Sequence, residues 1–139
     1  AVNQIRARLN RDVSLVVIDP IYKLSAGEED HDYEWAAVAR VASQTTELAQ
    51  SEGLKIIATH QMNRAGADCP VPQLVHLKYS DAIADEVHHA LLVREEADGR
   101  HLRAYVAKAR QGPRGFEFRL RLDFAHGNIT DLGRVPIAD

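Results

Sequence analysis

Residues 13–19 read VSLVVID, and this stretch decides the fold. Five of the six residues before Asp19 are apolar, and most of them are β-branched. An unbroken run of this kind is typical of a strand buried on both faces, as strands are in parallel sheets covered by helices. Pro20 follows at once and ends the strand, because proline cannot donate a hydrogen bond to a neighbouring strand.

The sequence around this strand predicts a βαβ unit. Residues 1–11 read as a helix end, and residues 33–51 carry an apolar stripe at helical spacing with Gly53 just past it. Residues 55–59, KIIAT, form a second short apolar strand. A strand, a helix and a strand in this order imply parallel pairing and a right-handed crossover.

The second half of the chain predicts antiparallel strands. Residues 61–79 read as a long irregular segment, and residues 80–86 as a helical turn. Strand-like runs follow, and the turn residues Asp98-Gly99 and Gly112-Pro113 separate them. These runs cover residues 88–94, 102–108 and 116–124.

The last run, residues 116–124, alternates strictly, with Glu117 on its polar face. We therefore expect an antiparallel strand near the sheet edge with one buried face. Together the elements predict an α/β fold in which a mostly parallel sheet ends in antiparallel C-terminal hairpins.

Composition bounds the class of protein. The 139 residues predict a single domain, residues 1–139, and 45% apolar residues suffice for a packed core. With 17 basic and 20 acidic residues the net charge is -3, which weakens an argument for nucleic-acid binding without excluding it. No apolar run approaches the ~20 residues of a membrane span, so we expect a cytoplasmic protein without membrane contact.

Asp19 is the first candidate for chemistry. Open α/β sheets bind ligands at the carboxyl ends of their strands, and an apolar strand that delivers one carboxylate there is the layout of a Walker B strand. Such a carboxylate holds a phosphate-bound Mg²⁺, usually through a coordinated water. The alternative is an aspartate that caps a turn before Pro20.

Gln61 ends the second apolar strand, beside Asp19 if the two strands are neighbours. An amide there can bond a γ-phosphate or position the attacking water, and the alternative is a polar strand end that faces solvent. Lys108 and Arg110 lie two apart at the end of another strand and share a face, where two cations suit a triphosphate. The alternative for them is ordinary solvated charge.

Taken together, these segments resemble the DnaB-type replicative helicases and their bacteriophage relatives, among the RecA-like ATPases. LVVIDP resembles the Walker B strand, IIATHQMNR the strand with a glutamine-leucine-asparagine-arginine-like motif, and AKARQGPRG a lysine-x-arginine before a glycine-proline turn. YSDAIADEVHHALLV and FEFRLRLDFAHGNITDL resemble later segments of the family, so the likeness runs from about residue 13 to residue 132.

The resemblance implies roles for particular residues. Asp19 corresponds to the Mg²⁺-binding carboxylate, Gln61 to the γ-phosphate sensor, and Arg110 to an arginine finger inserted into the next subunit's ATP site, with Lys108 beside it. The region 62–80 corresponds to DNA-facing loops, where Arg64 and Lys78 would contact phosphates. The length, glycine and prolines of residues 62–79 leave few buried contacts, so we expect this segment to be mobile without nucleic acid. The implied protein is a helicase in a hexameric ring that hydrolyses ATP with Mg²⁺ and moves along single-stranded DNA.

The sequence also departs from the family's pattern. No G-x-x-x-x-G-K-[ST] phosphate-binding loop occurs, so we expect the C-terminal portion of an ATPase core, incomplete at its N-terminal side, that does not hydrolyse ATP alone. Asp81 stands where the family usually has glycine. A recombinase-like DNA-dependent ATPase, a non-catalytic ring module that supplies the finger, and a plain interaction domain remain as alternatives.

Overall fold

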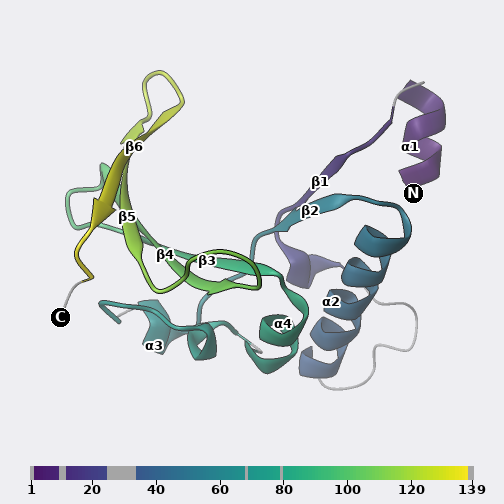
Figure 1. Cartoon of the computed structure of the whole chain (residues 1–139), viewed down its shortest axis with the longest axis horizontal. Coiled ribbons are helices and arrows are strands. Elements are labelled where there is room, and N and C mark those ends of the chain that lie inside the picture. Colours follow the sequence, from purple (N-terminus) through teal and green to yellow (C-terminus); the bar gives the residue numbers. More distant parts are fainter. Residues whose placement is uncertain (1, 10–11, 25–33, 68, 79, 138–139) are drawn as a thin grey trace. The chain divides into compact units, whose positions relative to one another are not determined.

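The computed structural model describes residues 2–9, 12–24, 34–67, 69–78 and 80–137. The chain divides into two compact units, Ala1–Gln61 and Met62–Asp139. Each unit is described by itself below (Figure 1). None of the helices in the described ranges combines the length and apolarity that a membrane span requires.

Unit 1 is the predicted βαβ unit. Strands β1 (Leu15–Ile18) and β2 (Lys55–Ala58) pair in parallel, with Ile18 opposite Ala58. The helix α2 (Glu34–Ser51) runs between them in the sequence and packs beside β2 (Figure 1). The remaining elements of unit 1 are α1 (Val2–Leu9) and the short 3₁₀ helix η1 (Ile21–Lys23). Buried side chains of α2, Val38, Val41 and Ala42, form its core.

The expectation that the first strand is buried on both faces is wrong for unit 1, and the second strand is also exposed on one face. Leu15, Val17 and Ile57 are 48%, 63% and 56% exposed. In the parallel register Val17 lies opposite Ile57, so these side chains share one face of the two-stranded sheet. The α2 helix packs with the opposite, half-buried face, and the described residues of unit 1 leave the other face open.

Unit 2 holds a four-stranded antiparallel sheet in the order β3-β4-β5-β6 (Figure 1). Both predicted turns are confirmed, and so is the α/β class, with parallel pairing in unit 1 and antiparallel hairpins in unit 2. The strands are β3 (His89–Glu95), β4 (His101–Ala109), β5 (Glu117–Asp123) and β6 (Asn128–Val135). The helices are α3 (Arg64–Ala67), η2 (Leu74–His76) and α4 (Ser80–Glu86).

The β5 strand lies near the edge of the sheet, as predicted, between β4 and the edge strand β6. The β6 sequence NITDLGRV lacks a regular apolar alternation, and its side chains are almost all exposed. A strand held mainly by backbone hydrogen bonds to its neighbour leaves little trace in the side-chain pattern.

The described residues of the segment 61–79, namely 61–67 and 69–78, are folded and not irregular. Met62 and Leu77 form an antiparallel bridge, and the Asn63 backbone N–H donates to the His76 carbonyl at 2.7 Å. Gly66 makes this packing possible, because a Cβ added there would lie 2.5 Å from the His76 Cβ. Pro72 is fully buried and Leu77 nearly so. The reasoning that this segment has few buried contacts is therefore wrong, while its mobility without nucleic acid stays a prediction.

The polar face of β5 is not a solvent face. Arg94, Arg103 and Arg119 lie directly opposite one another across β3, β4 and β5. Glu117, only 1% exposed, accepts a hydrogen bond from Arg103 at 3.0 Å and lies 3.7 Å from Arg94. Glu96 accepts hydrogen bonds from both Arg103 and Arg119, at 2.8 and 3.0 Å. Two carboxylates thus form ion pairs with a row of three arginines within the sheet.

Candidate functional site

Asp19 follows β1 directly and is exposed at the carboxyl end of the strand. Because β1 and β2 are parallel with Ile18 opposite Ala58, the next residues, Asp19 and Thr59, leave the sheet side by side. The Thr59 hydroxyl donates a hydrogen bond to Asp19 Oδ1. The Thr59 backbone N–H also donates to the Ile18 carbonyl at 2.9 Å, which fixes the position of the hydroxyl.

This arrangement fits a magnesium ion bound through water. A carboxylate is the hard oxygen ligand that Mg²⁺ uses, usually alongside several waters. Thr59 bonds only Oδ1, so among the described residues Oδ2 stays available to a metal-bound water. Asp19 is the residue that would hold the ion, which supplies charge neutralisation for bound phosphates.

Gln61 leaves the same end of the parallel pair, two residues after Thr59, and its side chain is exposed. The predicted parallel pairing is confirmed, and it brings Asp19 and Gln61 to one edge of unit 1. Near this edge, Tyr22 meets the His60 ring edge-on with the ring centres 5.9 Å apart. An exposed amide at the same strand end as a carboxylate can bond a phosphate oxygen or a water.

In unit 2, the structure brings Lys108 and Arg110 together at the end of β4. Lys108 Nζ donates to the Ala84 and Asp85 carbonyls of α4, the latter at 3.4 Å. Arg110 Nη2 donates to the Asp85 carbonyl at 3.0 Å, and the Arg110 side chain is exposed. Each cation keeps donors beyond these bonds, because an ammonium has three and a guanidinium five.

The proposed DNA-contacting residues lie on the folded segment of unit 2. Arg64 begins α3, and Lys78 follows the bridged residue Leu77. Both side chains are exposed. The helix α3 packs against η2, so the segment that carries these cations has a defined shape.

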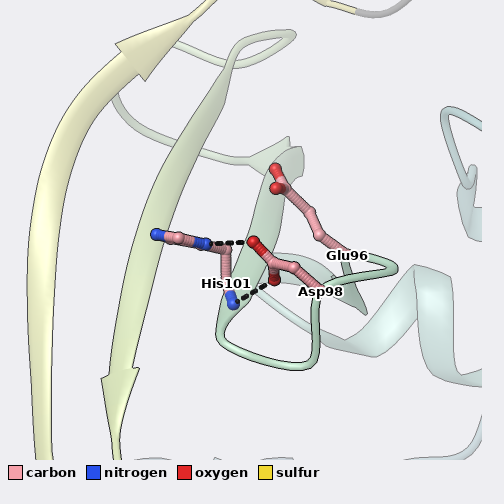
Figure 2. A group of neighbouring side chains, drawn as sticks. All are labelled: Glu96, Asp98 and His101. Carbon is pink, nitrogen blue, oxygen red and sulfur yellow. Dashed lines mark hydrogen bonds and ion pairs between the residues drawn. The ribbon is translucent and has the colours of Figure 1, made fainter.

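A cluster at the β3–β4 turn consists of residue types that can bind a metal, but its side chains are engaged in other interactions. The ligand atoms of Glu96, Asp98 and His101 lie within 4.8 Å of one another (Figure 2). Asp98 accepts from the backbone N–H groups of Arg100 and His101 and bonds His101 Nδ1 at 2.6 Å. Because the Glu96 carboxylate is engaged by arginines, we interpret the cluster as one that fixes the turn.

The hydrogen bonds at this turn lower the pKa values of two of its carboxyl groups. The Arg100 backbone N–H, with help from His101, lowers the pKa of Asp98 from 3.8 to about 2. The hydrogen bond from Arg119, together with that from Arg103, lowers the pKa of Glu96. Hydrogen bonds to a carboxylate favour its charged form, so both groups stay ionised well into acid.

Sequence reasoning missed two contributors to these sites. Thr59 gave one usable signal: it directly follows the second strand, as Asp19 follows the first, so parallel pairing sets the two residues opposite each other. The carbonyls of Ala84 and Asp85 gave none, since any residue type presents the same backbone acceptor.

Comparisons with known proteins agree with this architecture. Residues 1–128 match a family model described as the DnaB-like helicase C terminal domain. A search of curated proteins found no match. Among solved structures, a chain from "The Structure Of A DnaB-Like Replicative Helicase And Its Interactions With Primase" is similar, with a TM-score of 0.79 and 18% sequence identity. The alignment covers 95% of this chain and 33% of that chain, which confirms the predicted RecA-like fold.

Proposed function

Because this chain belongs to the DnaB-like helicase C-terminal domain family, we propose that it is part of a motor subunit that couples ATP hydrolysis to movement along single-stranded DNA. The observation that carries the proposal is the parallel pairing of β1 and β2. It brings Asp19 and Gln61 to one strand edge, where α/β sheets bind their ligands. This chain spans about a third of the solved helicase chain that it resembles, so we propose the activity for a complete helicase and not for these 139 residues.

In this proposal the nucleotide site lies between subunits of a ring, a hexamer in the proposed form. Asp19 holds the Mg²⁺ of bound ATP, and Gln61 bonds the γ-phosphate or its attacking water. Lys108 and Arg110 of the neighbouring subunit face the same triphosphate. We attribute no ATP turnover to these 139 residues alone, because phosphoryl transfer also needs backbone N–H groups and a lysine around the phosphates.

The test uses the complete helicase with Arg110→Ala. A finger stabilises charge that develops in the transition state, so turnover should fall by roughly 10³–10⁵ while nucleotide affinity falls only modestly. Arg114→Ala is the matched control, since Arg114 is an exposed arginine of the same turn. Steady-state hydrolysis and equilibrium nucleotide binding separate the two effects.

Mixed rings then decide whether Arg110 acts on its neighbour. Subunits with Arg110→Ala and subunits with Asp19→Ala should be inactive separately and regain part of their activity when mixed. Some interfaces would then pair an intact Asp19 with an intact Arg110. Absence of rescue in rings that demonstrably exchange subunits would contradict a role in trans.

For DNA, we propose Arg64 and Lys78 as phosphate contacts. Each lost contact should reduce the slope of log affinity against log salt by about 0.7 for single-stranded DNA. Arg64→Ala and Lys78→Ala should each show this change in fluorescence anisotropy titrations of the complete helicase. Arg100→Ala, which removes an exposed arginine from the β3–β4 turn, should not. An unchanged slope in the double variant would exclude both residues.

A further inference from the structure

The last turn of α4 accepts hydrogen bonds from both candidate phosphate-binding cations. The final four carbonyls of a helix have no partner within the helix. In α4, Lys108 Nζ bonds the carbonyls of Ala84 and Asp85, and Arg110 Nη2 bonds that of Asp85 at 3.0 Å. These bonds satisfy carbonyls at the end of the helix and hold the two cations against it. We call the Ala84 and Asp85 carbonyls the α4 seat.

The backbone around the two cations is tied to the same place. The Arg110 backbone N–H donates to the His88 carbonyl at 2.9 Å, two residues after α4 ends. Lys108 pairs with Ala90 in the sheet, next to an irregularity of the β3–β4 register. A shift of the last turn of α4 therefore carries both the backbone and the side chains of the cation pair with it.

The other neighbour of α4 is the segment that carries the proposed DNA contacts. The short helix η2 contacts α4 and α3, whose first residue is Arg64. The bridge between Met62 and Leu77 closes this segment on itself just before Lys78. Ile83 of α4 and Leu77, which directly follows η2, are both buried, and α4 contacts η2.

We propose that α4 is a positioning element that transmits the occupancy of the DNA-facing segment to Arg110 and Lys108. This inference rests on the proposed function, because it assigns a regulator to the same cation pair. The α4 seat uses one of the five donors of Arg110, so the guanidinium is held in place while its remaining donors can reach a phosphate. Nucleic acid that shifts η2 moves α4 and thereby re-aims Arg110.

The test is charge reversal at the seat in the complete helicase. Asp85 is exposed, so Asp85→Lys places a cation at the helix end that competes for the same carbonyls and repels Lys108 and Arg110. Turnover with and without single-stranded oligothymidylate should show the stimulation by DNA reduced about five-fold or more, the lower range of coupling between protein sites. Affinity for the oligonucleotide should stay unchanged, and affinity for nucleotide should fall no more than it does in Arg110→Ala.

Two matched variants serve as controls for this result. Asp85→Asn keeps the seat free of a competing cation and should retain the wild-type stimulation. Glu95→Lys makes the same charge reversal on an exposed residue at the far end of β3 and should also behave as wild type. Equal loss in Glu95→Lys would reduce the effect to net charge and overturn the inference.

Hydrogen exchange gives a readout that does not depend on turnover. Addition of the oligonucleotide should change protection of the Val87 and Arg110 amides, which donate to the Ile83 and His88 carbonyls. Unchanged protection at both, or wild-type stimulation in Asp85→Lys, would overturn the role of α4 while Arg110→Ala still abolished hydrolysis. Normal hydrolysis in Arg110→Ala would instead overturn the proposed function itself.

Discussion

In unit 1 the Asp19 carboxylate stands exposed at a strand end, and one hydroxyl orients it, whereas in unit 2 two cations lie against the carbonyls of a helix end. The two sheets differ in a similar way. Unit 1 leaves Val17 and Ile57 exposed on its two strands, whereas the four-stranded sheet of unit 2 holds a network of ion pairs. The comparison indicates that unit 2 fixes its site residues through its own contacts, and that few contacts hold Asp19 among the described residues of unit 1.

We expect the largest loss of stability when the ion-pair network of unit 2 is disrupted. Glu117→Ala removes a buried carboxylate, takes away the acidic group that lies 3.7 Å from Arg94, and leaves Arg103 with Glu96 as its remaining carboxylate partner. Breaking a buried ion pair typically costs about 3–5 kcal/mol, so protection in hydrogen exchange should collapse across β3–β6. Peptides from β1 and β2 serve as the internal reference and should keep their protection.

Glu95→Ala is the control for this prediction, because Glu95 is an acidic residue exposed on β3. Its loss should change the stability of unit 2 by no more than about 0.5 kcal/mol, as is usual for surface positions. If Glu117→Ala were equally mild, the ion-pair network would not be what stabilises the sheet.

A smaller effect tests the single bond in unit 1. Thr59→Val removes the hydroxyl that bonds Asp19 and keeps the β-branched shape. Loss of a group that orients a metal ligand typically weakens metal binding by about 10- to 100-fold, so nucleotide binding should need roughly 10-fold more Mg²⁺. Thr59→Ser should restore the wild-type dependence, and Thr130→Val, at an exposed threonine of β6, should leave it unchanged.

Equal Mg²⁺ requirements in the Thr59→Val variant and the wild type would show that this hydroxyl does not orient Asp19. The titration follows nucleotide binding and not turnover, so it separates ligand orientation from later steps of hydrolysis. A merely structural role of Thr59 would lower stability without shifting the Mg²⁺ dependence.

The smallest expected effect concerns acid and the β3–β4 turn. The pKa of Asp98 is lowered to about 2, below the roughly 3.9 of an unfolded aspartate. Its contribution to folding is therefore present above about pH 4 and is lost as the pH falls toward 2. The lowered pKa of Glu96 acts in the same direction.

Urea unfolding followed by far-ultraviolet circular dichroism should reveal this linkage. Asp98→Asn should lower the midpoint slightly at pH 6, and the difference from wild type should shrink as the pH approaches 2. Glu95→Gln is the matched control and should show no such trend. A difference that stayed constant with pH would mean that the charge of Asp98 does not stabilise the turn.

These outcomes also show which features a sequence can reveal. The helix at 33–51, the parallel strands and both hairpin turns follow from apolar periodicity and glycine placement, and the structure confirms them. The burial of Glu117 could not be predicted, because strict alternation in β5 gives the face of a residue but not its partners. Only the pairing of β3, β4 and β5 brings the arginines to this carboxylate.

The candidate site likewise has parts that the sequence reveals and parts that it does not. Asp19, Gln61, Lys108 and Arg110 were visible as polar residues at strand ends, since strand ends are recognisable from sequence. The α4 seat was not, because its acceptors are backbone carbonyls and their position depends on where α4 ends relative to β4. For the segment 61–79, glycine and prolines suggested irregularity, yet Gly66 is what allows it to close upon His76.

The row formed by Arg94, Arg103 and Arg119 has a consequence for how the chain folds. Like charges directly opposite one another oppose strand pairing unless anions lie among them. Glu96 and Glu117 supply those anions only in the native alignment. A slip by one residue would turn a strand's arginine toward the face that holds buried Ala104, away from its carboxylate partners. The arginine row thus disfavours misaligned pairing of the hairpins and helps to select the native register of the sheet.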